Sequence, residues 1–122
     1  VHAMAHPVSG FFNVAHGVAN AILLPHVMKF NMLADRGQYR RIADLLGEDV
    51  SGLSDLEAAP LAIEAVVRLS SDLGIPKGLS DVGVTEDKIP SMAADAMLSG
   101  NVKINPRMTT LEDLVSIFHD AM

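Results

Sequence analysis

The central feature of this sequence is the stretch Val18-Ala-Asn-Ala-Ile-Leu-Leu-Pro-His-Val-Met-Lys-Phe-Asn31, in which nearly every position is apolar or small. A segment that is apolar around most of its circumference predicts a helix buried on most sides. Pro25 lies inside it, and a proline there removes a backbone donor and crowds the preceding turn, so we expect a kink. We expect His26, the next residue, to play a structural role by hydrogen-bonding the carbonyl group that the kink releases.

Two more helices are predicted after this stretch. Apolar residues recur at helical spacing over residues 34–46, and Gly47 is placed to end that helix. Ser54 and Glu57 form a capping box ahead of the longest periodic stretch, which Gly74 ends. The apolar face expected along this helix consists of Leu56, Ala59, Ile63, Val66, Val67, Ser70 and Leu73.

The last part of the chain also follows a helical pattern. Thr85 can cap a helix that runs to about Ser99, with Pro90 as a break, and a loop is expected over residues 100–107. Thr110 caps a final helix, whose apolar stripe is Leu111, Leu114, Val115, Phe118 and Met122. No segment alternates like a strand, and there is no internal repeat, so the sequence predicts an all-α helical bundle.

Composition narrows the class of protein. The chain has 122 residues, 49% of them apolar, with a formal net charge of −6 and no cysteine. The absence of a basic surface argues against nucleic acid as a principal partner, and the absence of cysteine excludes a thiolate metal site. The apolar runs are too short to cross a membrane, and the first residues do not resemble a signal peptide. These features predict a soluble, cytoplasmic protein, and the positive mean hydropathy suggests either a well-filled core or a face that packs against another domain or subunit.

Three of the five histidines lie within the first sixteen residues: His2, His6 and His16. Imidazole is a common metal ligand, so this clustering raises the chance of a metal site, although a histidine beside an apolar face is more often structural. On a helix, His2 and His6 would share one face, but Pro7 restricts His6 and tends to end the helix there. Ala3 occupies the position of the general-base glutamate of H-E-x-x-H metalloproteases, which excludes that reaction. We expect His119 to lie at the surface.

Two blocks of sequence lie close together near the start: His2-Ala-Met-Ala-His6-Pro-Val-Ser-Gly10 and His16-Gly-Val-Ala-Asn-Ala-Ile-Leu-Leu-Pro25. Phe30-Asn31 and Asn105-Pro106-Arg107 follow further along the chain. Together these blocks resemble the signature of the iron-dependent (group III) alcohol dehydrogenases. The resemblance covers essentially the whole chain, and two histidines at this spacing before the His-Gly block form a specific pattern.

The resemblance implies a fold and a set of site residues. Residues 1–122 would form the C-terminal, all-α, metal-binding domain of a dehydroquinate synthase-like enzyme with two domains. In that family one aspartate and three histidines hold a divalent metal, and the last two of these histidines correspond to His2 and His16. The residue that corresponds to His6 is not a ligand; it lies near the nicotinamide and the substrate and assists proton movement. Met97 is a candidate for the substrate pocket by its position, although a methionine at helical spacing is more often a core residue.

The resemblance also implies a reaction: the interconversion of a primary alcohol or diol and its aldehyde by hydride transfer, with Fe²⁺ or Zn²⁺ and with NAD or NADP. The remaining aspartate and histidine, and the α/β domain that binds the dinucleotide, would precede Val1, so we expect a form truncated on its N-terminal side. Gly78, Gly83 and Gly100 are isolated and form no phosphate-binding loop. We therefore expect this chain alone to be inactive, to bind metal weakly or not at all, and to self-associate through apolar surface. Its expected partners are the missing N-terminal domain, a small alcohol or aldehyde, and further copies in a homo-oligomer.

Two alternatives come from different classes of protein. One is a stand-alone helical interaction module whose histidines are structural. The other is a small metal-sequestering protein that uses all three N-terminal histidines, although no Asp or Glu lies within the first sixteen residues to complete such a site.

Overall fold

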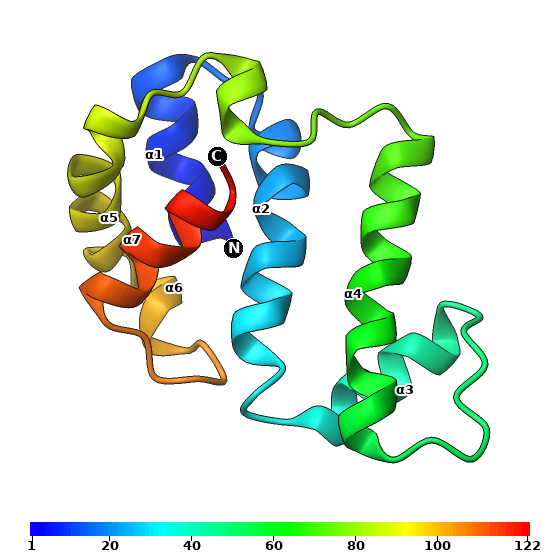
Figure 1. Ribbon diagram of the computed structural model, residues 1–122. Helices are drawn as coiled ribbons and strands as arrows, with labels where there is room; N and C mark the ends of the chain where they lie inside the picture. The colour runs from blue at the N-terminus through cyan, green and yellow to red at the C-terminus, as the bar shows by residue number, and fades with distance from the viewer.

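The structure, a computed structural model, describes all residues 1–122 and contains helices and loops only, which confirms the all-α prediction. In Figure 1 one group of helices forms a bundle around the two chain ends, and α3 and α4 stand to one side of it. No helix combines the length and the apolar character needed to cross a membrane. The helices are α1 His2–Phe12, α2 His16–Asn31, α3 Arg36–Leu45, α4 Asp55–Asp72, α5 Ile89–Met97, α6 Gly100–Lys103 and α7 Leu111–Asp120, with short 3₁₀ turns η1 Leu79–Val82 and η2 Glu86–Lys88.

Most of the buried apolar surface lies in one cluster, which we call the main core. It contains 18 buried residues from α1, α2, α5 and α7 and from the connector that precedes α5. Phe118, Ile22 and Met92 are among its largest fully buried side chains. Fully buried alanines such as Ala5 and Ala93 lie between them, and small side chains allow helices to approach closely. The main core therefore joins segments from both ends of the chain.

Helix α2 lies at the centre of the molecule, as predicted. It packs against α1 and α7 on one side and α4 on the other, and only Leu24 and Lys29 stay exposed beyond its first turn. The helix begins at His16, two residues before the predicted start, and continues through Pro25. The predicted hydrogen bond of His26 to a released carbonyl is wrong, because the half-buried His26 side chain makes no hydrogen bond and lines the grooves on either side of α2.

Helix α1 corrects a second expectation. Pro7 does not end the helix, which runs without interruption from His2 to Phe12. A proline inside a helix costs about 3 kcal/mol because one backbone hydrogen bond is lost. Here Pro7 itself is buried next to Val8, and Met4 is buried one turn earlier, so packing against the main core offsets that cost.

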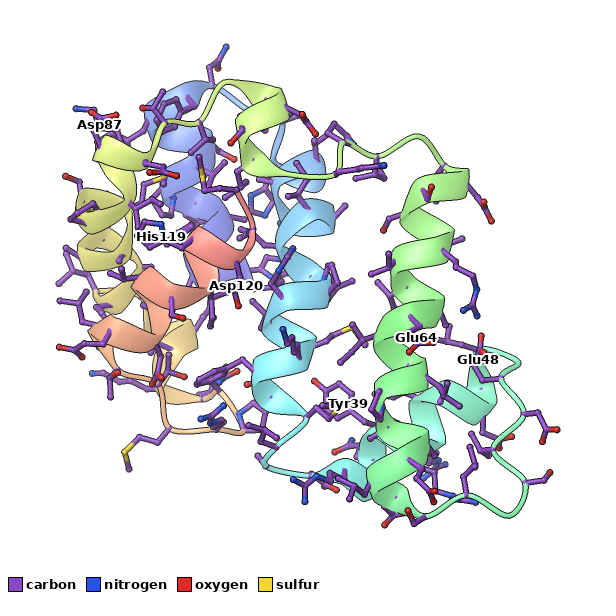
Figure 2. The ribbon with its side chains drawn as sticks, viewed as in Figure 1. Tyr39, Glu48, Glu64, Asp87, His119 and Asp120 are labelled. Carbon is purple, nitrogen blue, oxygen red and sulfur yellow. The ribbon has the colours of Figure 1, made fainter.

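Helices α3 and α4 pack against each other as a unit that we call the α3–α4 hairpin, residues 36–72. Its apolar cluster is small: Met28 of α2, Ala43 and Ala62 form it, with Tyr39 half-buried beside them, between α2 and α4 in Figure 2. Burial raises the pKa of Tyr39. Because only a small cluster is buried here, polar contacts contribute much of what holds the hairpin together.

The apolar face predicted for α4 is correct in part: Ala59 is fully buried, and Ile63 and Val66 are half-buried against the small cluster, but the large residues at both ends are exposed. The buried side of α4 consists of alanines: Ala58, Ala59, Ala62 and Ala65. Leu56 and Leu73, which were predicted to face the interior, are 63% and 69% exposed. Methyl side chains let α3 approach α4 closely, and this approach turns the larger leucines outward.

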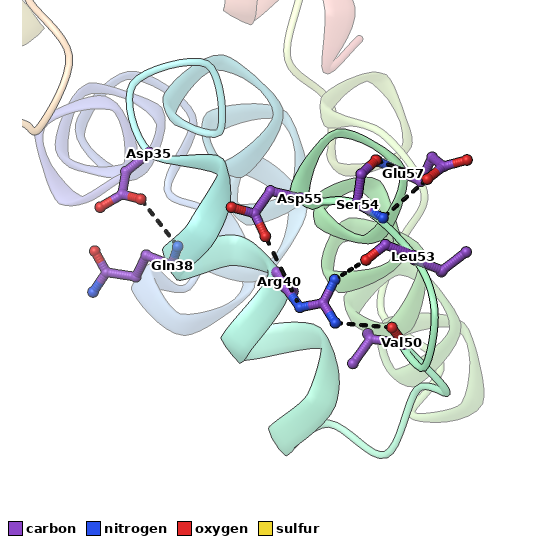
Figure 3. A network of polar contacts seen from close by, with 8 residues as sticks. All are labelled: Asp35, Gln38, Arg40, Val50, Leu53, Ser54, Asp55 and Glu57. Atoms are coloured by element: carbon purple, nitrogen blue, oxygen red, sulfur yellow. Dashed lines mark hydrogen bonds and ion pairs between the residues drawn. The ribbon is translucent and has the colours of Figure 1, made fainter.

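Arg40 connects α3 to the loop that leads into α4 (Figure 3). Its guanidinium donates hydrogen bonds to the carbonyl groups of Leu53 and Val50, and lies 3.9 Å from the Asp55 carboxylate. The predicted capping box is confirmed at the same corner, where Ser54 and Glu57 satisfy each other's backbone N–H groups at the start of α4. A positive φ of 70° at Gly74 accompanies the predicted end of this helix.

The chain returns to the main core through the connector that carries η1. Leu79 N–H donates to the carbonyl of Ala121 at 2.8 Å, next to Gly78. A Cβ atom at Gly78 would lie 2.4 Å from the backbone oxygen of Met122, so this close approach requires glycine. The connector is thereby fixed against the end of α7.

The C-terminal helices differ from their predicted limits. Thr85 makes no capping hydrogen bond, and α5 begins at Ile89, with Pro90 in its first turn, where a missing N–H costs nothing. The predicted loop over residues 100–107 contains the short helix α6. Thr110 caps α7 through a capping box with Asp113, as predicted for Thr110. Leu114 and Phe118 of the predicted stripe are buried, but Leu111 is exposed and Ile117 takes a buried position instead.

A polar clamp joins the end of α2 to the loop before α7. The side-chain amides of Asn31 and Asn105 donate to each other, with N···O distances of 2.9 and 2.8 Å. Arg107 donates to the carbonyl of Phe30 at 2.9 Å, and its guanidinium lies 3.9 Å above the Phe30 ring. The Phe-Asn and Asn-Pro-Arg motifs, far apart in the sequence, thus act as one structural unit.

Candidate metal centre

The three N-terminal histidines come together on neighbouring helices. His2 and His6 lie one turn apart on α1, and His16 is the first residue of α2. The turn between the helices begins at Asn13, which adopts the left-handed conformation with φ 54° and ends α1. The ring centres of His2 and His16 are 5.4 Å apart, and those of His6 and His16 are 5.2 Å apart. All three side chains are exposed, so a ligand can reach them.

The ring spacing of the histidines fits metal binding. Two imidazoles on one tetrahedral metal, at nitrogen–metal distances of about 2.1 Å, have ring centres roughly 5 Å apart. The rings of His2 and His16 are tilted by 54°, whereas His6 is stacked on His16 at 27°. Both distances to His16 are near the spacing of two ligands, so the distances alone do not choose between His2 and His6 as its partner.

These 122 residues contain no complete set of metal ligands. No group of three or more His, Asp or Glu side chains is arranged to hold a metal ion. A catalytic zinc site uses about three protein ligands. The donors are imidazole nitrogens, which suit both iron and zinc. The arrangement is therefore chemically suited to one half of a metal site.

A cavity lies directly beside His6. Its volume is about 570 Å³; α1 supplies most of its walls, and the end of α5 with the two residues after it supplies the rest. Met97, the predicted pocket residue, is half-buried and packs against the main core instead. Its neighbours in the sequence face the cavity, so a role for Met97 in substrate binding stays a prediction. The lining residues are Ala3, His6, Pro7, Gly10, Phe11, Asp95, Leu98 and Ser99.

One residue of the site escaped the sequence prediction. Asn20, one turn after His16, donates from Nδ2 to the Nε2 atom of His16 at 2.9 Å and to the His16 carbonyl oxygen at 3.0 Å. Its position four residues after a histidine on a helix was a usable signal, because residues at that spacing meet on the helix surface.

The other two histidines lie away from this cluster. His119 is exposed on α7, as expected (Figure 2). His26 is half-buried between α2 and its neighbours, and burial lowers its pKa, with a smaller opposing effect from Asp120 and a smaller reinforcing effect from Lys29. Neither histidine belongs to the candidate centre.

Comparison with known proteins adds an independent line of evidence. The model of the Fe-containing alcohol dehydrogenase family, C-terminal, matches residues 1–122. The chain is 48% identical to 1,3-propanediol dehydrogenase of Klebsiella pneumoniae over 121 residues, which is 99% of this chain and 31% of that protein. It is 50% identical to lactaldehyde reductase of Escherichia coli (strain K12), over 99% of this chain and 32% of that protein.

A solved structure shares the fold as well. The crystal structure of a 1,3-propanediol oxidoreductase superposes with a TM-score of 0.97 at 47% sequence identity, covering 99% of this chain and 32% of that one. The chain thus spans about a third of the length of the proteins that it resembles.

Proposed function

Since this chain belongs to the Fe-containing alcohol dehydrogenase family, we propose that it forms the metal- and substrate-binding part of an enzyme that interconverts a primary alcohol or diol and its aldehyde by hydride transfer to or from NAD or NADP. The tilted pair of His2 and His16, with ring centres 5.4 Å apart, is the observation that carries the proposal. Relatives whose names specify a diol or an aldehyde substrate support the substrate class.

His2 and His16 are the proposed ligands of a divalent metal, with Fe²⁺ as the first candidate and Zn²⁺ as the second. A bound divalent metal supplies a Lewis acid that polarises the oxygen of the alcohol or aldehyde. Two histidines leave room for ligands from outside residues 1–122, which the family pattern supplies as one aspartate and one further histidine. An oxygen and nitrogen ligand set of this kind suits either metal.

His6 is the proposed proton carrier and the proposed contact to the nicotinamide. It stacks on His16 at 5.2 Å and lines the cavity beside the cluster, so its ring lies between the proposed ligand and space for a substrate. Imidazole is the side chain best suited to accept and release a proton near neutral pH. A histidine at this position can take the hydroxyl proton of an alcohol, directly or through a water molecule, while its side chain stays outside the ligand set.

The 122-residue chain is proposed to be inactive alone and to work with an N-terminal domain that binds the dinucleotide. Several large apolar side chains near the His6 cavity and the adjoining loop are exposed, with Leu98 at 85% and Met108 at 89%. Exposed apolar surface of this kind fits a partner domain or further copies in a homo-oligomer. Turnover by the 122-residue chain above background would contradict the inactivity, and a monomeric chain at high concentration would contradict the self-association.

The ligand assignment is tested by zinc titration of the chain, followed through the histidine ring signals by NMR, and by anaerobic calorimetry with iron(II). Wild type is compared with a His2→Ala/His16→Ala variant. A His26→Ala/His119→Ala variant, which removes as many histidines elsewhere, is the control. We expect weak binding that the first variant loses and the control keeps. Binding that survives the loss of His2 and His16 would refute the assignment.

The same titration separates the alternatives. A metal-sequestering protein would bind tightly and stoichiometrically through all three histidines, so tight binding would overturn the proposal of a half-site. A stand-alone interaction module with structural histidines would bind no metal, and the His2→Ala/His16→Ala variant would then lose stability rather than affinity. Weak, histidine-dependent binding by a fully folded chain is expected only from the half-site.

A further inference from the structure

The cavity beside His6 has one negatively charged wall. Polar side chains line it at three points: His6 on α1, Asp95 on α5, and Ser99 just after α5. The other lining residues are apolar or glycine, and no lysine or arginine is among them. A carboxylate thus faces the cavity with no cation in the walls to neutralise it.

Helix α5 holds Asp95 in this position. Met92, Ala93 and Ala96 of the same helix are fully buried in the main core, which fixes the helix, whereas Asp95 lies on its exposed side. The ion pairs of the chain involve other residues. The carboxylate is therefore held by a rigid element and is free to interact with a molecule in the cavity.

Ser99 adds a hydroxyl group to the same wall. Its Oγ atom accepts a hydrogen bond from the N–H group of Asn101 at 3.3 Å, which leaves the hydroxyl hydrogen available. The charge of the wall is decided by Asp95 alone. An ammonium group is positively charged and only donates hydrogen bonds, so it suits this carboxylate, whereas a carboxylate on the substrate would be repelled by it.

We propose that Asp95 is a specificity-determining residue, which favours primary alcohols with an ammonium group, such as amino alcohols, over those with a carboxylate. This inference rests on the proposed function of His6 and its cavity in alcohol oxidation. His6 and Asp95 line the same cavity, so a substrate whose reacting hydroxyl lies near His6 has its remaining atoms in the field of the carboxylate.

The test measures kcat/KM of the full-length enzyme that contains these residues. Its substrates are three primary alcohols of similar length: 3-amino-1-propanol, 1-butanol and 3-hydroxypropanoate, which are positive, neutral and negative. Wild type should prefer the amine to the carboxylate. Asp95→Asn, which keeps the shape and removes the charge, should lower the ratio of their kcat/KM values roughly tenfold, because one charge acts with opposite sign on the two substrates. Asp87→Asn, which removes an exposed carboxylate on η2 outside the cavity, is the matched control and should keep the ratio.

Salt and charge reversal separate an electrostatic role of Asp95 from a structural one. The wild-type ratio should fall as the ionic strength rises, because salt screens exposed charges, and Asp95→Asn should lose most of this dependence. Asp95→Lys should reverse the preference, and it serves if Asp95→Asn does not fold.

The outcomes distinguish this inference from the proposed function. Turnover of 1-butanol with a ratio that Asp95→Asn leaves unchanged would overturn the inference alone, as would a wild-type preference for the carboxylate. No turnover of any of the three alcohols by wild type would refute the proposed function, and the inference with it.

Discussion

The main core and the α3–α4 hairpin are held together in different ways. The main core buries 18 residues, contributed by helices from both ends of the chain, and contains every large side chain that is fully buried. The hairpin buries a few small side chains between two consecutive helices, and relies on Arg40, on a capping box and on the ion pair of Arg68 with Glu48. Long-range apolar packing therefore dominates one region, and local polar contacts dominate the other.

This difference explains where the candidate metal centre lies. The histidines sit on α1 and α2, both of which are anchored in the main core. The proposed metal ligands need a rigid support, and the main core supplies one. The hairpin has few buried contacts and many exposed leucines, so we expect it to open locally at lower free energy than the rest.

The largest effect is expected from Phe118→Ala, which removes a fully buried ring from the main core. Replacing a buried phenylalanine by alanine costs about 3–5 kcal/mol, because apolar contacts are lost and a cavity is left. Leu69→Ala in the hairpin, where the side chain is 52% exposed, is the contrasting variant and should cost far less. Urea denaturation followed by circular dichroism measures both. Similar losses of unfolding free energy in the two variants would contradict the claim that apolar packing contributes more in the main core than in the hairpin.

A smaller loss is expected from Asn105→Ala at the polar clamp. The amide of Asn31 is only 8% exposed, and it would lose both of its hydrogen bonds to Asn105. Leaving a buried polar group unpaired costs about 1–3 kcal/mol. The free energy of unfolding in urea measures the loss, and Asn101→Ala, at an exposed asparagine nearby, should cause almost none. An equal effect of both variants would show that the clamp adds no stability.

The two capping boxes provide a matched test of the comparison. Ser54→Ala removes the cap of α4 in the hairpin, and Thr110→Ala removes the cap of α7 in the main core. Each should cost about 1 kcal/mol. Amide hydrogen exchange distinguishes them, because Ser54→Ala should lower protection in α3 and α4 only, whereas Thr110→Ala should lower it throughout the main core. Loss of protection everywhere in both variants would mean that the hairpin and the main core unfold as one unit.

The smallest effect concerns pH and His26, which lies between the two regions. Burial lowers the pKa of His26 in the folded chain, so the proton binds more tightly to the unfolded chain. His26 therefore contributes stability above the usual imidazole range, and this contribution is lost as the pH falls toward the lowered pKa. His26→Gln should flatten the slope of unfolding free energy against pH in that window, and His119→Gln should leave it in place. An unchanged slope of unfolding free energy against pH in His26→Gln would show that His26 makes no such contribution to stability.

The sequence predicted much of the fold from local rules. The capping boxes at Ser54 and Thr110 and the helix end at Gly74 were found correctly, because a cap or a left-handed turn depends on residues within a few positions of each other. The predicted helix end at Pro7 and the predicted helix start at Thr85 were wrong. At both positions, packing against the main core outweighs the local preference of the residue. The apolar face of α4 failed at Leu56 and Leu73 for a related reason, since periodicity alone does not reveal whether leucines or alanines meet the neighbouring helix.

For the candidate centre, the sequence by itself determined the family and the three histidines, because a motif of residue types at fixed spacing can be recognised without coordinates. Only the tertiary structure decided that the rings of His2 and His6 lie 5.4 and 5.2 Å from the ring of His16, and that the amide of Asn20 faces Nε2. It also joined Asn31 to Asn105 across 74 positions of sequence. Ring planes, amide orientations and contacts between distant segments depend on how whole helices pack, and spacing along the chain does not contain that information.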